Sequence, residues 1–286
     1  MAKDTTEFNK KRTINAAGKL IELDTPKVMG IINITPDSFF SESRKTNVED
    51  AVKQAGKMLA DGADFLDIGA YSSRPGAVDI TVQEELDRLL PIVEAIAADF
   101  PEAVMSIDTF RAKIAEEAIK AGAHIINDIS GGELDEEMFP TVARLNVPYI
   151  LMHMKGTPQN MVYQAQYEDV FNEVTDYFVK KYYQLRQLGV HDVILDPGFG
   201  FAKKSEHSYA LMNRLQDFKI LGLPVLVGIS RKRMIYGLTG GTAAEALNGT
   251  TVLNAIALTK GADILRVHDV KEAVEAVKIW QQVRNS

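Results

Sequence analysis

The sequence predicts a (β/α)8 barrel, the TIM-barrel member of the α/β class, and two features of its pattern carry that prediction. Short apolar runs of strand length alternate with longer segments whose apolar residues recur every three or four positions, as on core-facing helices. Apolar strands separated by crossover helices imply a parallel sheet with covered faces, and eight such units imply closure into a barrel. We expect one domain over residues 1–286, with the barrel proper at about 27–283.

The predicted strands are the eight short apolar runs, and the clearest predicted helices are four of the segments between them. The strands cover residues 28–32, 65–68, 104–107, 124–126, 147–152, 193–195, 225–229 and 264–267. The helices cover residues 48–60, 82–98, 112–121 and 167–188. Ahead of the barrel, residues 13–23 have Ala-Ala-Gly-Lys in the middle, which predicts a short N-terminal β-hairpin that plugs the bottom of the barrel.

Composition excludes several kinds of protein. The formal net charge of −7 argues against a nucleic-acid partner, because affinity for a phosphate backbone comes mostly from clustered Lys and Arg. The chain has no cysteine, which rules out disulfides, thiolate metal sites and cysteine nucleophiles. We find no apolar run of signal-peptide or membrane-span length, so we expect a cytoplasmic protein without a membrane partner. We also expect no fused second enzyme after the eighth helix.

Polar residues follow every predicted strand at its carboxyl end, the face where barrel enzymes build their sites. They are Asn33, Ser72, Ser73, Arg74, Asp108, Asn127, Asp128, His153, Asp196, Ser230, Lys232, Arg266 and His268. Taken singly, many have a plain structural interpretation: Asp108 as a helix cap or turn residue, His153 as a core histidine. That interpretation is weaker for Asp196, Lys232 and Arg266, because an unpaired charge at the end of an apolar strand is costly to bury.

The chemistry of this rim indicates two kinds of ligand group. Two carboxylates and an amide can bind a flat heterocycle that presents adjacent NH and NH2 donors. Guanidinium, imidazole and hydroxyl groups suit a phosphate. The sequence therefore predicts a binding site at the carboxyl ends of the strands, which we call the mouth of the barrel. We expect the mouth to bind a nitrogenous ring on one side and a polyanion on the other. No glycine-rich dinucleotide fingerprint or Walker A motif competes with this prediction.

Eight motifs together carry a resemblance to a known family. They are GIINITPDSF at 30–39, SRPG at 73–76, SIDT at 106–109, HIINDI at 124–129, LMHM at 151–154, DPGFGF at 196–201, SRK at 230–232 and RVHD at 266–269. From about Lys27 to its end the chain resembles the dihydropteroate synthases. The resemblance implies a transferase of folate biosynthesis and a sulfonamide target. Such an enzyme condenses 6-hydroxymethyl-7,8-dihydropterin pyrophosphate with p-aminobenzoate to give 7,8-dihydropteroate and pyrophosphate.

The resemblance also implies roles for individual residues. Those expected to bind the pterin are Asp108, Asn127, Met152, Asp196 and Lys232. Those expected to bind the pyrophosphate are Asn33, Ser72, Ser73, Arg74, Arg266 and His268. Those expected to bind p-aminobenzoate are Phe39, Ser73, Pro75, Phe201, Ser230 and Lys232. A Mg2+ on the diphosphate would be held partly by Asn33, with few protein ligands, as is usual for Mg2+ at phosphate sites.

The catalytic residues implied are Asp108, Lys232 and Arg266. In the family's SN1-like reaction the bond from the pterin methylene to the pyrophosphate oxygen breaks early, which leaves a ring-delocalised cation and a departing polyanion. Asp108 is the electrostatic partner expected for the cation, whereas Arg266, His268 and Mg2+ are expected to stabilise the leaving group. The amine of p-aminobenzoate then attacks.

Two further expectations concern the end of the chain. Ser230 is expected to begin a helix, so that its hydroxyl and the free backbone N–H groups hold the carboxylate of p-aminobenzoate. The resemblance suggests a homodimer formed through the last helices, where residues 243–258 are rich in small side chains.

The chain departs from the usual family pattern at Tyr71, where many relatives have Glu, and at Ala202, where they have Gly.

Two other functions remain to be weighed. A methyltetrahydrofolate-dependent methyltransferase acting on a corrinoid protein shares the pterin-binding barrel but needs no anion site, and Arg266 and His268 count against it. A noncatalytic barrel that merely binds pterins or a partner predicts damage to some of the polar rim, and the sequence shows none.

Overall fold

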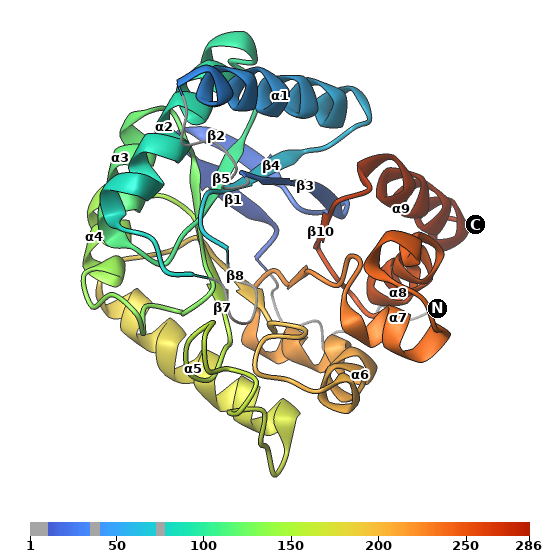
Figure 1. Ribbon diagram of the computed structural model, residues 1–286. Coiled ribbons are helices and arrows are strands. Elements are labelled where there is room, and N and C mark those ends of the chain that lie inside the picture. Colours follow the sequence, from blue (N-terminus) through green and yellow to red (C-terminus); the bar gives the residue numbers. More distant parts are fainter. Residues whose placement is uncertain (1–10, 35–40, 73–77) are drawn as a thin grey trace.

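The fold is the predicted one: a ring of parallel strands lies inside an outer layer of helices (Figure 1). The computed structural model describes residues 11–34, 41–72 and 78–286. The strand order is β8-β7-β6-β5-β4-β3-β10-β9, and every pair in it is parallel. The ring is nearly closed by a parallel bridge between Leu195 of β8 and Val225, the residue before β9.

The barrel strands follow the predicted apolar runs closely. They are β3 (Lys27–Asn33), β4 (Phe65–Gly69), β5 (Met105–Asp108), β6 (Ile125–Asp128), β7 (Tyr149–Met152), β8 (Val193–Asp196), β9 (Leu226–Val227) and β10 (Ile264–Val267). The largest difference is β9, which has only two residues in strand pairing instead of the five predicted.

The helices include the four whose bounds were predicted, and two of these begin elsewhere: the helix predicted at 48–60 begins earlier, and the helix predicted at 167–188 begins at Val170. They are α1 (Ser41–Ala60), α2 (Val82–Asp99), α3 (Ala112–Lys120), α4 (Met138–Leu145), α5 (Val170–Gln187), α6 (Ser205–Asn213), α7 (Arg233–Thr239), α8 (Leu247–Thr259) and α9 (Val270–Arg284), with 3-10 turns η1 (Leu215–Leu221) and η2 (Ala243–Glu245). Helix α1 begins seven residues before the predicted position, because its first seven residues include no apolar one and so show no periodicity. Among the described residues, no helix combines the length and hydrophobicity that a bilayer span requires.

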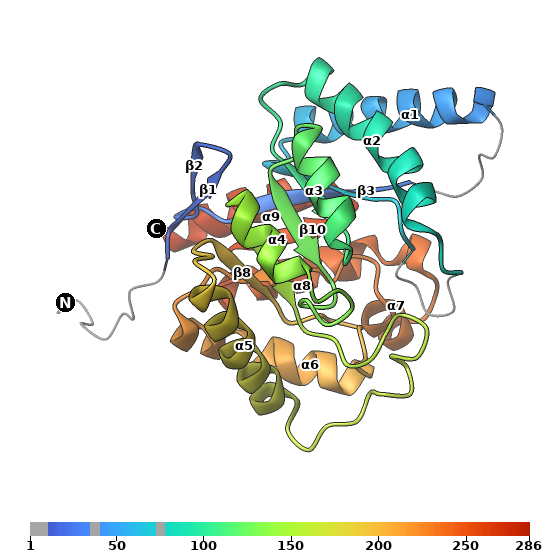
Figure 2. The ribbon, with the colours of Figure 1, turned by 90° about the vertical axis from the view of Figure 1, so that its left-hand side faces the viewer.

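The predicted hairpin is present as β1 (Thr13–Ala16) and β2 (Lys19–Glu22), and it covers one end of the barrel (Figure 2). Ile14 and Ala16 of the hairpin are fully buried. They pack against a layer of apolar side chains inside the barrel, which we call the apolar layer: Met29, Phe65, Val104, Ile125, Ile150, Ile194, Leu226 and Ile264. The hairpin therefore plugs the amino-terminal end of the barrel, as the sequence predicts.

A second layer of inward positions lies two residues further along each strand, because alternate side chains of a strand point to the same face. This layer, which we call the polar layer, contains Ile31, Asp67, Ser106, Asn127, Met152, Asp196, Gly228 and Arg266. It lies nearer the carboxyl ends of the strands than the apolar layer does. The barrel thus places an apolar floor beneath a set of charged and amide groups.

We expect Ile14→Ala to lower the free energy of unfolding by about 2–4 kcal/mol, because it leaves a cavity where a fully buried side chain fills the end of the barrel. Urea unfolding followed by circular dichroism measures this. Leu20→Ala is the matched control: Leu20 lies in the same hairpin but is 68% exposed, so its loss should change stability by less than about 0.5 kcal/mol. Equal effects of the two substitutions would show that the hairpin does not plug the barrel.

Candidate active site

The polar layer is organised around one guanidinium, that of Arg266 in β10. Its Nε donates to Oδ2 of Asp67 at 2.6 Å, and its Nη2 donates to Oδ2 of Asp108 at 2.7 Å. Asn127 of β6 donates from Nδ2 to the Asp67 carboxylate at 3.1 and 3.3 Å. These four residues form what we call the central ion cluster, and they come from four different strands.

Asp67 was not among the predicted site residues. Its side chain is fully buried in the middle of β4, whereas the prediction considered only residues at strand ends. The signal was nevertheless in the sequence, because Asp67 interrupts the apolar run Phe65-Leu66-Asp67-Ile68. A carboxylate in such a position requires a buried cation or several hydrogen bonds, and the structure supplies both through Arg266 and Asn127.

The Asp108 carboxyl has a strongly perturbed acidity. Burial raises the pKa of Asp108 to about 7, the Arg266 guanidinium opposes this shift, and the Asp67 carboxylate adds to it. Room for Asp108 comes from Gly69 at the end of β4, where an added Cβ would lie 3.2 Å from the Cβ of Asp108. The carboxyl is therefore poised near neutrality beside a permanent cation.

Asp196 and Lys232 form a second charged group at the mouth. Asp196 ends β8, is 6% exposed and accepts a hydrogen bond from the backbone N–H of Gly198 at 2.8 Å. Lys232 donates from Nζ to the carbonyl of Phe199 at 2.5 Å, and its Nζ lies 4.7 Å from the centroid of the Phe201 ring. Burial lowers the pKa of Lys232 to about 8 although the Asp196 carboxylate opposes the shift, and burial raises the pKa of Asp196.

Asp196 and Arg266 are neighbours, as the sequence interpretation requires. An added Cβ at Gly228, in the polar layer between them, would lie 3.9 Å both from Oδ2 of Asp196 and from Cδ of Arg266. Asp196 and Arg266 are 70 residues apart in the chain but lie beside the same glycine. The structure therefore brings the carboxylate and guanidinium groups predicted from scattered strand ends to one end of the barrel.

Ser230 and His268 lie together, but not at a helix terminus. Oγ of Ser230 is 3.0 Å from Nδ1 of His268 and accepts from the backbone N–H of His268 at 3.2 Å. The expectation that Ser230 begins a helix is wrong: α7 begins at Arg233, because Arg231 adopts a left-handed conformation with φ of 56°. Burial and the Arg266 charge lower the pKa of His268 to about 4, so its imidazole is neutral at pH 7.

A buried lysine that the prediction did not include supports the other side of the mouth. Nζ of Lys203 is 2.8 Å from Nδ1 of His153 and donates to the carbonyls of His153 and Phe201, both at 3.1 Å. His153 is thus a satisfied core histidine, in line with its plain structural interpretation. Burial, with the Lys203 charge second, lowers the pKa of His153 well below its ordinary value. Lys203 fixes the backbone of Phe201.

Phe201 packs on a small apolar cluster at the mouth, which we call the mouth cluster: Ile129, Met152, Met154, Met161 and Ala202, with Phe110 and Leu134 against it. Ala202 has φ of 48°, a conformation in which a glycine would not be strained. The mouth cluster thus gives the mouth an apolar surface beside its charged groups. Met152, predicted to contact the pterin, belongs to it.

The remaining predicted residues lie at the rim or outside the described part. Asn33 at the end of β3 and Ser72 after β4 are both exposed. Phe39, Ser73, Arg74 and Pro75 lie outside the described residues. Within residues 11–34, 41–72 and 78–286, no three histidine, aspartate or glutamate side chains converge as metal ligands.

Comparison with known proteins gives consistent matches over most of the chain. The profile of the family described as "Pterin binding enzyme" matches residues 29–268. The dihydropteroate synthase of Escherichia coli (strain K12) is 45% identical over 267 residues, which are 92% of this chain and 94% of that protein. The crystal structure of Yersinia pestis dihydropteroate synthase with a sulfonamide drug complex aligns with a TM-score of 0.90 and 39% identity over 96% of this chain and 100% of that one. Xanthomonas albilineans dihydropteroate synthase with 4-aminobenzoic acid aligns with a TM-score of 0.89 and 38% identity over 96% and 99% of the two chains.

We expect Asp67→Asn to lower the pKa of Asp108 below its value of about 7, because the substitution removes the repulsion of a neighbouring carboxylate while Arg266 stays in place. Carbon-13 NMR titration of labelled aspartate carboxyls measures this pKa. Asp24→Asn is the control, since Asp24 pairs with Arg12 on the surface and should leave the titration of Asp108 unchanged. An unchanged or higher pKa in Asp67→Asn would contradict the account of the cluster.

Proposed function

Because this chain belongs to the family of pterin-binding enzymes, we propose that it is a dihydropteroate synthase. It condenses 6-hydroxymethyl-7,8-dihydropterin pyrophosphate with p-aminobenzoate and releases pyrophosphate. The observation that carries the proposal is the convergence of Asp108, Asn127, Asp196, Lys232 and Arg266 at one open end of the barrel. A ring-binding carboxylate and amide set lies there beside the cations that a diphosphate requires.

The pterin lies against the polar layer in this proposal. The Asp196 carboxylate accepts two adjacent N–H bonds from the ring, a geometry that an ionised carboxylate suits. The Asn127 amide and the Lys232 ammonium bind its remaining polar edge, and Met152 supplies an apolar contact. The support for this placement is that Asp196 and Asn127 are buried within the same layer of the barrel.

The diphosphate lies towards Arg266 and His268, with Asn33, Ser72, Ser73 and Arg74 at the rim. His268 is neutral at pH 7 and donates a hydrogen bond rather than a charge. A Mg2+ fits this side of the mouth. The exposed Asn33 carbonyl is a ligand of the type Mg2+ accepts, and a Mg2+ at a phosphate site takes most of its ligands from substrate and water. When bound, the ion would supply charge to the departing pyrophosphate.

The reaction follows from the charges of the central ion cluster. As the bond from the pterin methylene to the pyrophosphate oxygen breaks, positive charge spreads into the ring and negative charge gathers on the leaving group. The Asp108 carboxylate, held by Arg266, faces the developing cation and stabilises it. Arg266 has five N–H donors and is permanently charged, so it can bind both Asp108 and the leaving group. The amine of p-aminobenzoate then attacks the methylene and releases one proton to solvent.

The p-aminobenzoate lies nearer the rim, on the mouth cluster. Phe201 contacts its ring, Lys232 and Ser230 bind its polar groups, and Phe39, Ser73 and Pro75 complete the pocket. Since Ser230 does not begin a helix, its contribution is the hydroxyl beside His268 rather than a helix terminus. The ammonium of Lys232 lies over the Phe201 ring and so reaches both substrates.

A homodimer through the last helices is part of the proposal. Helices α8 and α9 pack together, and Val252, Ile256, Ile279 and Val283 on them are exposed apolar residues. Val252 and Ile256 lie one turn apart on the same face of α8, as do Ile279 and Val283 on α9. A second copy of this chain would cover these side chains.

We expect the purified protein, incubated with Mg2+, the pterin pyrophosphate and p-aminobenzoate, to form dihydropteroate and pyrophosphate in equal amounts. Chromatography of the pterin product and a phosphate assay after pyrophosphatase measure the two. Asp196→Asn should abolish pterin binding in calorimetry, because an amide cannot accept both ring N–H bonds. Methyl transfer to a corrinoid protein without pyrophosphate release, or pterin binding without turnover, would instead support one of the other two functions.

We expect a bell-shaped dependence of kcat/KM on pH. Asp108 must be ionised, so activity falls as the pH drops below its pKa of about 7. Lys232 must be protonated, so activity falls as the pH rises above its pKa of about 8. Lys232→Arg should move the alkaline limb to higher pH, because arginine stays charged. An alkaline limb that remains in that variant would show that Lys232 is not the group responsible.

A further inference from the structure

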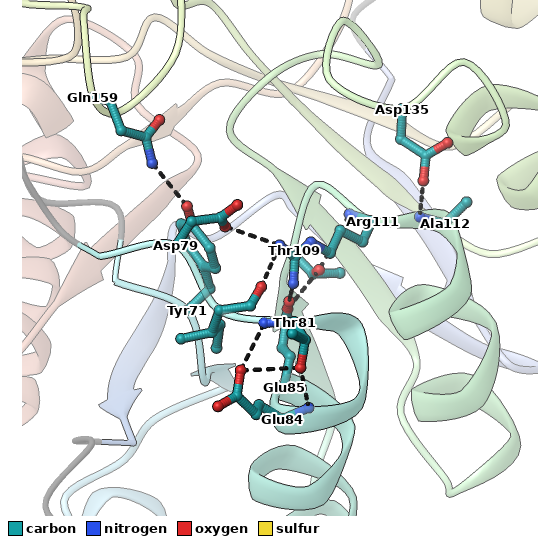
Figure 3. Close-up of polar contacts among 11 residues, drawn as sticks. Tyr71, Asp79, Thr81, Glu84, Glu85, Thr109, Arg111, Ala112, Asp135 and Gln159 are labelled. Atoms are coloured by element: carbon teal, nitrogen blue, oxygen red, sulfur yellow. Dashed lines mark hydrogen bonds and ion pairs between the residues drawn. The ribbon is translucent and has the colours of Figure 1, made fainter.

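Arg111, between β5 and α3, joins several segments at the carboxyl ends of the strands (Figure 3). Its guanidinium donates to Oε2 of Glu85 at 2.9 Å, to Oδ1 of Asp79 at 3.0 Å and to the carbonyl of Ile80 at 2.6 Å. The side chain is 14% exposed. The Arg111 guanidinium therefore has three acceptors. Two lie in the β4–α2 connection and one lies in the first turn of α2, so Arg111 ties these segments to the β5–α3 connection.

Glu85 connects this guanidinium to the residue that follows Asp108. Its side chain is 1% exposed in the first turn of α2, and its Oε1 accepts from the Thr109 hydroxyl at 2.9 Å. The Thr109 hydroxyl also accepts from the backbone N–H of Arg111 at 3.2 Å. A buried carboxylate bound to both residues fixes the backbone immediately after Asp108.

The same guanidinium supports two aromatic rings at the mouth. Its Cζ lies 5.3 Å from the ring centroids of both Tyr71 and Phe110, and these rings meet edge to face at 4.9 Å. Phe110 packs on the mouth cluster, and the Tyr71 hydroxyl accepts from Nε2 of Gln159 in the β7–α5 connection at 3.0 Å. Figure 3 shows Gln159 bound to Tyr71, and Arg111 bound to Asp79 and Glu85.

We propose that Arg111, held by Glu85, is a positioning residue for the reaction: it fixes the Asp108 carboxylate beside the developing cation and Phe110 beside the mouth cluster. The inference rests on the proposed function. Neither Arg111 nor Glu85 contacts Arg266, Asp196 or Lys232 in any described hydrogen bond or ion pair. Their contacts towards the site run through Thr109 and Phe110, and the Glu85 charge also helps to raise the pKa of Asp108. Sequence reasoning assigned neither of them a role.

Positioning of this kind predicts a specific kinetic signature. Asp196 and Asn127 hold the pterin from other strands, so loss of Arg111 leaves ground-state binding largely intact. Asp108 is also expected to bind the pterin, but the positive charge that it stabilises develops only as the bond breaks, and a displacement of about 1 Å in such a group can cost about a hundredfold in rate. The loss should therefore fall on kcat rather than on KM.

The test is steady-state kinetics of Arg111→Met with both substrates varied. We expect kcat to fall about tenfold while both KM values change by less than about threefold. Arg111→Lys keeps the charge but has a single donor group in place of the planar fork, so its kcat should lie between those of Arg111→Met and the wild type. Calorimetric affinity for the pterin pyrophosphate should be unchanged in all three proteins.

The controls separate positioning from stability. Arg111→Met leaves the buried Glu85 without its cation, so the double variant Glu85→Gln, Arg111→Met removes both charges and should recover thermal stability but not kcat. Arg214→Met is the matched arginine: its guanidinium binds Asp217 and lies over Phe171 in the outer helices, and its loss should leave kcat unchanged.

Two results would overturn the proposal. One is a kcat of the double variant within twofold of the wild type. The other is a loss in Arg111→Met that appears only as a higher KM. A wild-type protein that turns over neither substrate would refute the proposed function itself, whereas an active wild type beside an equally active Arg111→Met would refute only the role of Arg111.

Discussion

The ion pairing of Arg266 with Asp67 and Asp108 is the constraint on which the rest of the active end depends. Removing two carboxylates and a guanidinium from water costs several kcal/mol per ion, and only their mutual attraction and hydrogen bonds offset it. The three groups come from β10, β4 and β5, so they meet only if the barrel closes in the observed register. Fold and chemistry are thus specified by the same contacts, and the apolar layer beneath supplies the stability that the polar layer lacks.

Strand alternation explains how much of this could be predicted from the sequence. Apolar runs located all eight barrel strands and the hairpin, because each depends on local hydrophobicity and turn residues. Asp67 was missed although it interrupts an apolar run, because only residues at strand ends were considered and its partner Arg266 lies 199 positions away in the chain. Ser230 was misplaced because Arg231, whose side chain pairs with Asp269, adopts a left-handed conformation that no local sequence pattern indicates. The single domain, the cytoplasmic location, Mg2+, the homodimer and the individual substrate contacts stay predictions.

The two sides of the mouth differ in how they obtain rigidity. Beside β5, a buried carboxylate and guanidinium, Glu85 and Arg111, join α2 to the segment after Asp108. Beside β8, a buried lysine, Lys203, binds three acceptors around His153 and Phe201. Both arrangements place buried hydrogen-bonding groups behind the predicted site residues. An active end built on connections between strands and helices needs such support, because loops alone hold side chains less firmly than strands do.

The plugged amino-terminal end of the barrel determines how substrates enter and products leave. With Ile14 and Ala16 packed on the apolar layer, the barrel is closed at its amino-terminal end by apolar side chains. Both substrates would therefore enter, and both products leave, through the mouth at the carboxyl ends of the strands. In the proposed placement the pterin lies deeper in the barrel than p-aminobenzoate and would have to bind first, so the order of substrate binding follows from the depth at which each is held.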